Sequence, residues 1–152
     1  MSESLPEQQL NEFIAKYTPE IGDLARAALA KMRARLPGAI EMVYDNYNAL
    51  VIGFSPTERA SDAIFSLALY PRWINLFFLQ GVHLPDPNKR LKGNGKQVRS
   101  ITLQDAATLD EPAVQTLIAA ALEAADKPLD HAHPQRIIIK SISAKQRPRR
   151  PA

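Results

Sequence analysis

The hydrophobic positions of the first 36 residues follow a helical period. Six apolar residues share one predicted face: Ile21, Ala25, Ala28, Leu29, Met32 and Leu36. Their spacing predicts an amphipathic helix that begins after Thr18-Pro19-Glu20 and ends at Pro37-Gly38. The same period predicts a shorter helix at about residues 6–17 and a C-terminal helix between Pro112 and Lys127.

Between the helices, the pattern changes to short runs rich in β-branched and aromatic residues. Strands are predicted at 40–47, 49–54, 63–70, 72–80 and 97–103, with asparagine, serine, proline or glycine between them. Most connections are too short for crossover helices, so neighbouring strands are expected to be antiparallel. The sequence thus predicts an α+β fold with two layers, in which an antiparallel sheet of about five strands is flanked by N-terminal helices and a C-terminal helix.

The strand predicted at 72–80 is apolar on both faces. One face holds Trp73, Phe77 and Leu79, and the other holds Ile74, Leu76 and Phe78. Two interpretations are open at this point. The strand is either central and covered on both sides, or it buries one face against a partner, which makes a homodimer one expected assembly.

Charge is distributed unevenly along the 152 residues. Residues 131–152 hold six Lys and Arg and no acid, whereas residues 1–130 hold 13 Lys and Arg against 16 Asp and Glu. We expect a domain over residues 1–127 and a C-terminal extension over 128–152, with a strand at 136–142 and a basic tail that is disordered from Pro148. Such a tail is either a solvated segment or a contact for nucleic acid.

The composition excludes several classes of protein. The chain has no cysteine, which excludes disulfides, thiolate metal sites and cysteine nucleophiles. No apolar run approaches the ~20 residues of a membrane span. The polar start does not match a signal peptide, so a cytoplasmic protein without membrane contact is expected.

The most distinctive segment runs from Gly81 to Arg99. Five cations and no acid lie in its residues 89–99: Lys89, Arg90, Lys92, Lys96 and Arg99. Gly93 and Gly95 allow backbone N–H groups to turn inward as a nest for an anion, and Lys96 adds charge to it. Arg99 alternates with apolar strand residues, so it either pairs with an anion or, as the alternative, with a local acid such as Asp86.

Tyr44 and Trp73 are the aromatic candidates for a wall beside this segment. If the strands at 40–47 and 72–80 face one another, the two rings border a shallow pocket. Small-ligand sites combine such an apolar wall with a few polar groups. The alternative is that both rings belong to the core, as most aromatic residues in strands do.

Neither metal binding nor catalysis is expected from the remaining residues. His131 and His133 lie in a proline-flanked segment with only Asp130 nearby, whereas a metal site needs a defined ligand set. No serine lies in a Gly-x-Ser-x-Gly motif, and no pair of carboxylates is indicated for acid–base chemistry. We therefore expect a binding protein with no cofactor rather than an enzyme.

The order of these segments resembles a known family. The resemblance is carried by Pro37-Gly38-Ala39-Ile40-Glu41, by Tyr44, and by Gly93-Asn94-Gly95-Lys96 with Arg99. This pattern is similar to the domain of unknown function 1801, the YdhG-like family, over about residues 10–125. The resemblance implies a small two-layer α+β domain with an antiparallel sheet. It also implies an alternative function, because some relatives are described as frataxin-like intracellular iron chaperones.

Together these features predict a small cytoplasmic binding protein whose ligand is an anionic small molecule. The candidate ligand-binding residues are Lys96, Arg99, Gly93, Gly95, Tyr44 and Trp73. One alternative is an iron chaperone, as the resemblance implies. A second alternative is a nucleic-acid-associated protein that binds through its basic tail.

Overall fold

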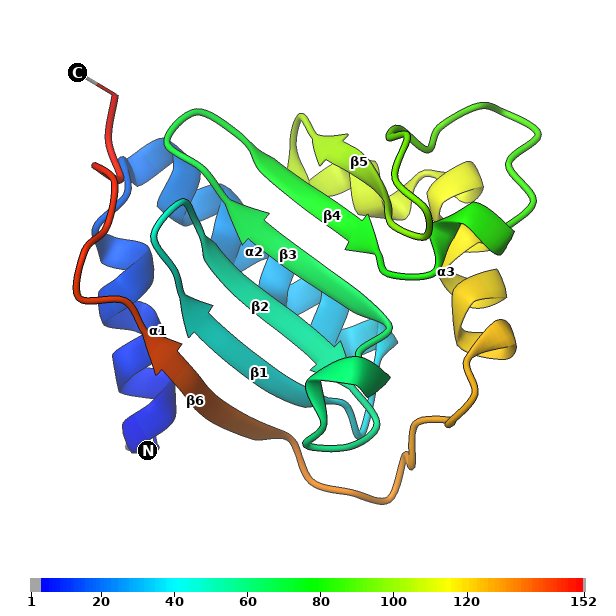
Figure 1. The fold of residues 1–152 in the computed structure, drawn as a ribbon, viewed down its shortest axis with the longest axis horizontal. Helices are drawn as coiled ribbons and strands as arrows, with labels where there is room; N and C mark the ends of the chain where they lie inside the picture. Colours follow the sequence, from blue (N-terminus) through cyan, green and yellow to red (C-terminus); the bar gives the residue numbers. More distant parts are fainter. Residues whose placement is uncertain (1–3, 152) are drawn as a thin grey trace.

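The computed structural model describes residues 4–151, and this part of the chain has an α+β fold, as predicted (Figure 1). The helices are α1 (Leu5–Ala15), α2 (Pro19–Arg35) and α3 (Pro112–Ala124). The strands are β1 (Ile40–Asp45), β2 (Leu50–Ser55), β3 (Phe65–Leu69), β4 (Ile74–Phe78), β5 (Arg99–Leu103) and β6 (Arg136–Ile142). Three short 3-10 helices are η1 (Ala60–Asp62), η2 (Gly81–His83) and η3 (Ala106–Asp110).

The N-terminal helices begin where the sequence places capping residues. The side chain of Ser4 accepts a hydrogen bond from the backbone N–H of Glu7, and that of Thr18 accepts one from Ile21, both at 3.3 Å. A proline follows within the first turn of α1 and of α2. Both features favour a helix start, because they satisfy or remove N–H groups that lack an intrahelical partner.

The sheet has six strands in the order β5-β4-β3-β2-β1-β6. Strands β1 to β5 form an antiparallel meander, but β6 pairs in parallel with β1, so the prediction of an antiparallel sheet of about five strands is wrong for this edge. Short connections make consecutive strands antiparallel within the meander. The rule does not apply to β6, because a long segment separates it from β1 in the sequence. After α3, a long linker runs along the bottom of the view and returns the chain beside β1 (Figure 1).

The two faces of the sheet differ in what covers them. Helices α1 and α2 lie behind the sheet in Figure 1, and the strand residues on that side belong to the main apolar core. In β4, Ile74, Leu76 and Phe78 are fully buried there, whereas Phe77 lies half-buried on the opposite face. The second apolar face of this strand is thus only partly covered, since Trp73 is 45% exposed, and burial of this face in a homodimer stays a prediction.

The C-terminal segment is part of the same sheet rather than a separate extension. Beyond β6, the chain folds back over the turn between β1 and β2, where the backbone N–H of Arg147 donates to the carbonyl of Tyr47 at 2.8 Å. Arg149 is buried, with its side chain 4% exposed. The prediction that the tail is disordered from Pro148 is therefore wrong for Arg149, because an acid in β1 gives it a buried partner.

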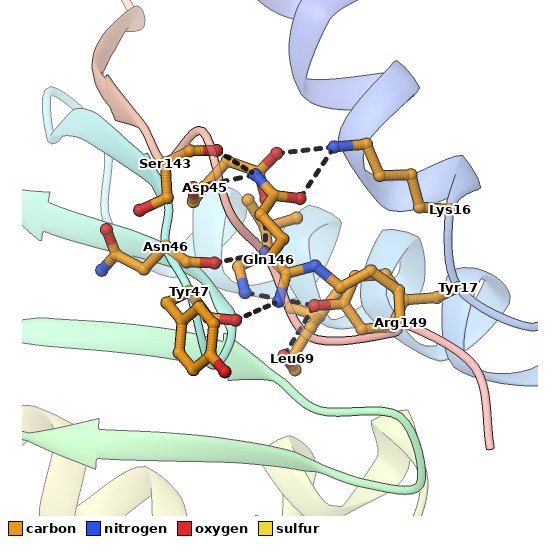
Figure 2. A network of polar contacts seen from close by, with 10 residues as sticks. Lys16, Tyr17, Asp45, Asn46, Tyr47, Leu69, Ser143, Gln146 and Arg149 are labelled. Carbon is orange, nitrogen blue, oxygen red and sulfur yellow. Dashed lines mark hydrogen bonds and ion pairs between the residues drawn. The ribbon is translucent and has the colours of Figure 1, made fainter. Parts of the chain in front are cut away.

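That partner is Asp45, which forms a buried polar network (Figure 2). Its carboxylate contacts the guanidinium of Arg149 at 2.9 Å and the ammonium of Lys16 at 2.8 Å. Arg149 also donates to the carbonyls of Asn46 and Tyr47. Burial raises the pKa of Asp45, but hydrogen bonds from Lys16, Gln146 and Arg149 outweigh this, so the pKa lies below its ordinary value.

A second ion network lies at the other end of β1. Arg33 of α2 donates to both carboxylate oxygens of Glu41, at 2.7 and 2.8 Å, and to both oxygens of Glu7, at 3.0 Å. Gln135 donates a further hydrogen bond to Glu41 at 3.2 Å. Burial disfavours the charge of Arg33, but its two carboxylate partners more than offset this and raise its pKa.

Gly38, between α2 and β1, lies where a side chain does not fit. Its φ is 85°, and a Cβ there would lie 1.9 Å from the carbonyl oxygen of Asp130. Gly38→Ala is expected to lower the free energy of unfolding by about 1–3 kcal/mol, because it adds backbone strain and displaces the linker. Urea denaturation measures the change. Gly95→Ala is the control, since the nearest atom to its Cβ is 4.0 Å away; equal losses in both variants would contradict the prediction.

Candidate functional site

Arg99, the first residue of β5, forms hydrogen bonds with the backbone of the glycine-rich segment that precedes this strand. The Nη1 of Arg99 donates to the carbonyls of Gly95 at 2.7 Å and Val98 at 2.8 Å. Gly93 has a φ of 124°, a conformation that favours glycine. Lys96 is exposed and has no ion-pair or hydrogen-bond partner among residues 4–151. Of the two cations predicted to bind an anion, Arg99 therefore bonds to the backbone of the loop, and Lys96 is exposed to solvent.

Asp86 does not pair with Arg99, which corrects the alternative drawn from the sequence. Its two carboxylate oxygens accept hydrogen bonds from the backbone N–H groups of Arg90 at 2.8 Å and Leu91 at 2.9 Å. Asp86 thus shapes the loop through its backbone. The charges of Asp86 and Arg99 did not predict these contacts. A charged side chain can form its hydrogen bonds with backbone N–H or carbonyl groups instead of with a side chain of opposite charge.

The structure does not bring Tyr44 and Trp73 together as a wall beside the glycine-rich segment. Tyr44 lies in β1 and Trp73 directly precedes β4, and two strands separate β1 from β4. Trp73 stacks on Tyr70, with 5.2 Å between ring centroids. It also lies at the opposite end of β4 from Arg99, which pairs with Phe78. The predicted arrangement fails because the meander places these strands three positions apart.

A cavity of about 470 Å³ lies at the end of β4 near the glycine-rich segment. It is bordered by η1, by η2, by Gln97, and by the C-terminal end of α3. Its apolar lining includes Ile64, Phe78 and Leu84. Its polar lining includes Ser61, Asp62, Gln80, His83, Gln97, Asp126 and Lys127. The sequence singled out the segment that holds His83 and Gln97, but not the distant residues that complete the cavity.

One ion pair joins two walls of this cavity. The ammonium of Lys127, after α3, lies 3.0 Å from the carboxylate of Asp62 in η1. The hydroxyl of Thr57 donates to the same carboxylate at 2.6 Å. These two hydrogen bonds hold the pKa of Asp62 below its ordinary value. Asp62 is therefore ionised at neutral pH and already engaged by the protein.

The histidines and acids do not gather into a metal site in the part of the chain that the structure describes. Across residues 4–151, no group of three or more His, Asp or Glu side chains is placed to hold a metal ion. His133 instead contacts Asp130 three residues before it, at 3.2 Å, in the exposed linker.

Among residues 4–151, no helix has the length and apolar character to cross a bilayer.

Comparison with known proteins returned no match: no family model, no curated protein and no solved structure matches this chain. The fold and the cavity therefore define the protein only as an α+β domain with a small polar-rimmed cavity. The resemblance to the YdhG-like family stays an expectation from the sequence.

Proposed function

We propose that this protein binds a small anionic molecule in the cavity bordered by η1, η2 and the end of α3. The observation that carries the proposal is the convergence of Gln80, His83 and Gln97 on this cavity. None of these three side chains has a hydrogen-bond partner among residues 4–151. An apolar lining with a few available polar groups is the usual composition of a small-ligand site.

The preference for an anion follows from the donors around the cavity. Glutamine amides and the histidine imidazole can donate hydrogen bonds to an anion, whereas the Lys127 ammonium is already paired with Asp62. The adjoining residues 89–99 hold five cations and no acid, which makes the potential on that side positive. Asp62 is offset by Lys127, which leaves Asp126 as the other carboxylate in the lining.

The state of Asp62 supports binding rather than acid–base catalysis by this residue. A general base at neutral pH requires a pKa near the working pH, whereas the pKa of Asp62 is lowered by Thr57 and Lys127. The glycine-rich segment that carries the YdhG-like resemblance also contributes Gln97 to the cavity. The proposed role is therefore that of a small-molecule binding protein within that type of fold.

Amide-resolved NMR titration with inorganic phosphate, and then with citrate, tests the proposal. At least one of the two anions is expected to bind with a Kd below about 1 mM and to shift the signals of Gln80, His83 and Gln97. Ala124→Phe places a ring at the cavity, and His83→Ala removes a donor; each is expected to weaken binding about tenfold or more.

Lys145→Ala is the matched control, because Lys145 is an exposed cation of the C-terminal segment, outside both the cavity lining and residues 89–99. Its effect on affinity is expected to be less than about twofold. Shifts centred on Lys96 and Arg99 would place the anion on the loop rather than in the cavity. The absence of saturable shifts with either anion up to about 10 mM would contradict the proposed function.

A further inference from the structure

A second surface, distinct from the cavity, lies at the opposite end of the sheet. It consists of the β1–β2 turn (residues 46–49), the β3–β4 turn (residues 70–73) and the C-terminal segment (residues 143–151), and we call it the hairpin-end surface. The two turns and the C-terminal segment gather on the left of Figure 1. The cavity adjoins Phe78 at the other end of β4.

The sheet register places these segments side by side. Leu50, after the first turn, pairs with Leu69, before the second. The two turns are therefore centred about two strand spacings apart, roughly 10 Å. The C-terminal segment is attached to the first turn by the backbone hydrogen bond between Arg147 and Tyr47 and by buried Arg149. The fold thus fixes all three segments relative to one another.

The hairpin-end surface is basic. Its three segments contain no acidic residue. Their exposed cations are Arg72, Lys145, Arg147 and Arg150. Arg149 adds no free charge, because Asp45 neutralises it. Four exposed cations on one end of a small domain are sufficient to attract a polyanion at low ionic strength.

Two aromatic rings are exposed among these cations. Tyr47 is 47% exposed and Trp73 is 45% exposed. Each ring is held on one side: Tyr70 stacks against Trp73 at 5.2 Å, and the guanidinium of Arg147 lies 5.6 Å from the centroid of Tyr47. These contacts fix the rings while leaving part of each surface open to solvent.

We infer that the hairpin-end surface binds single-stranded nucleic acid. Its cations contact phosphates, and the bases stack on Trp73 and Tyr47, the combination used by proteins that bind single strands with little sequence preference. The hairpin-end surface and its ligand class both differ from those of the cavity. The nucleic-acid contact then lies on an ordered surface that includes both turns, rather than on a disordered tail.

Single strands fit this surface better than a duplex or a membrane. In a duplex the bases are stacked on one another, so exposed rings on short turns have no base face to contact. A membrane-binding surface presents a broad apolar face, in which aliphatic side chains such as leucine accompany the aromatic rings. The three segments contain no leucine, isoleucine, valine or methionine, and asparagines flank Tyr47.

Fluorescence offers a readout specific to this surface, because Trp73 is the only tryptophan in the chain. Addition of a twelve-nucleotide oligouridine or oligothymidine at low salt is expected to quench the protein's tryptophan emission. The anisotropy of a labelled oligonucleotide gives the affinity. Trp73→Ala and Tyr47→Ala are each expected to weaken binding about tenfold.

The charge contribution is tested with the double variant Arg147→Gln/Arg150→Gln. Loss of two phosphate contacts is expected to reduce the slope of log K against log salt by about 1.4. The matched control is Lys89→Gln/Lys92→Gln, which removes two exposed cations at the far end of the sheet and is expected to leave affinity and slope unchanged. His83→Ala, in the cavity, is also expected to leave oligonucleotide binding unchanged, which separates this test from that of the proposed function.

Three outcomes would overturn the inference. The first is the absence of quenching and of an anisotropy change at about 20 mM salt. The second is equal affinity in the wild type and both aromatic variants, which would reduce the interaction to nonspecific charge. The third is quenching by vesicles containing anionic phospholipid but not by the oligonucleotides, which would identify a membrane surface instead. Circular dichroism of each variant confirms that the fold is retained.

Discussion

Asp45→Asn is expected to lower the free energy of unfolding by about 3–5 kcal/mol. The substitution keeps the shape of the side chain but leaves the buried guanidinium of Arg149 without an opposite charge. A single buried charge is costly, because the low-dielectric interior does not replace its hydration. Urea denaturation at pH 7 measures the loss, and the C-terminal segment is expected to become sensitive to proteases.

Asp110→Asn is the control for this prediction. Asp110 also contacts two cations, Lys31 and Arg35, each at 2.6 Å, but its side chain is 43% exposed. Its loss is expected to cost less than about 1 kcal/mol. If Asp45→Asn also lowers the free energy of unfolding by less than about 1 kcal/mol, the buried Asp45–Arg149 pair does not stabilise the C-terminal segment. The apolar double variant Asp45→Leu/Arg149→Met is expected to recover much of the stability.

The contribution of the Asp45 carboxylate to the free energy of unfolding is expected to decrease at acidic pH. Because the pKa of Asp45 is lower in the folded protein than its ordinary value of 3.8, the ionised carboxylate stabilises the fold above that value. The contribution is lost as the pH falls from about 3.8 through the folded pKa. The stability difference between the wild type and Asp45→Asn is therefore expected to shrink below pH 4 and to be constant near neutrality.

Arg33→Met is expected to cost about 3–5 kcal/mol at pH 8, because Glu41 and Glu7 then face one another without their shared cation. Burial raises the pKa of Glu41, and Arg33 opposes that shift. In the variant, the folded pKa of Glu41 is thus raised further, and the destabilisation is expected to decrease as the pH falls from 8 to 5.

Two further variants separate charge from packing at this position. Arg35→Met removes an arginine from the same helix whose guanidinium contacts the exposed Asp110, and we expect a loss below about 1 kcal/mol. Glu41→Gln in the Arg33→Met background is expected to restore stability at pH 8. No restoration, or a loss that is independent of pH, would show that the cost of Arg33→Met comes from packing.

Local patterns predicted the helices and most of the strands. Thr18 and the prolines in the first helical turns predict the starts of the helices to within a few residues, so the bounds of α2 were predictable from the sequence. The strand at 136–142 was also placed by its run of isoleucines. Its parallel pairing with β1 was not predictable, because the paired residues are 96 or 97 positions apart in the chain and no turn sets the register.

The candidate site was less predictable than the fold. Residue type identified Arg99 as a cation needing a partner, but not that the partners are the carbonyls of Gly95 and Val98. The cavity depends on Asp62 and Lys127, which lie 65 residues apart and meet only through the packing of α3. Such juxtapositions are set by tertiary structure, and single-sequence patterns carry no information about them.

The parallel pairing of β1 with β6 has a consequence for biosynthesis. During translation, β1 leaves the ribosome long before β6, and until β6 is made the outer edge of β1 has unpaired N–H and C=O groups. Unpaired edges recruit strands from other chains, and distant pairings form slowly. We therefore expect chains that end before residue 136 to aggregate more readily than chains in which β6 covers this edge.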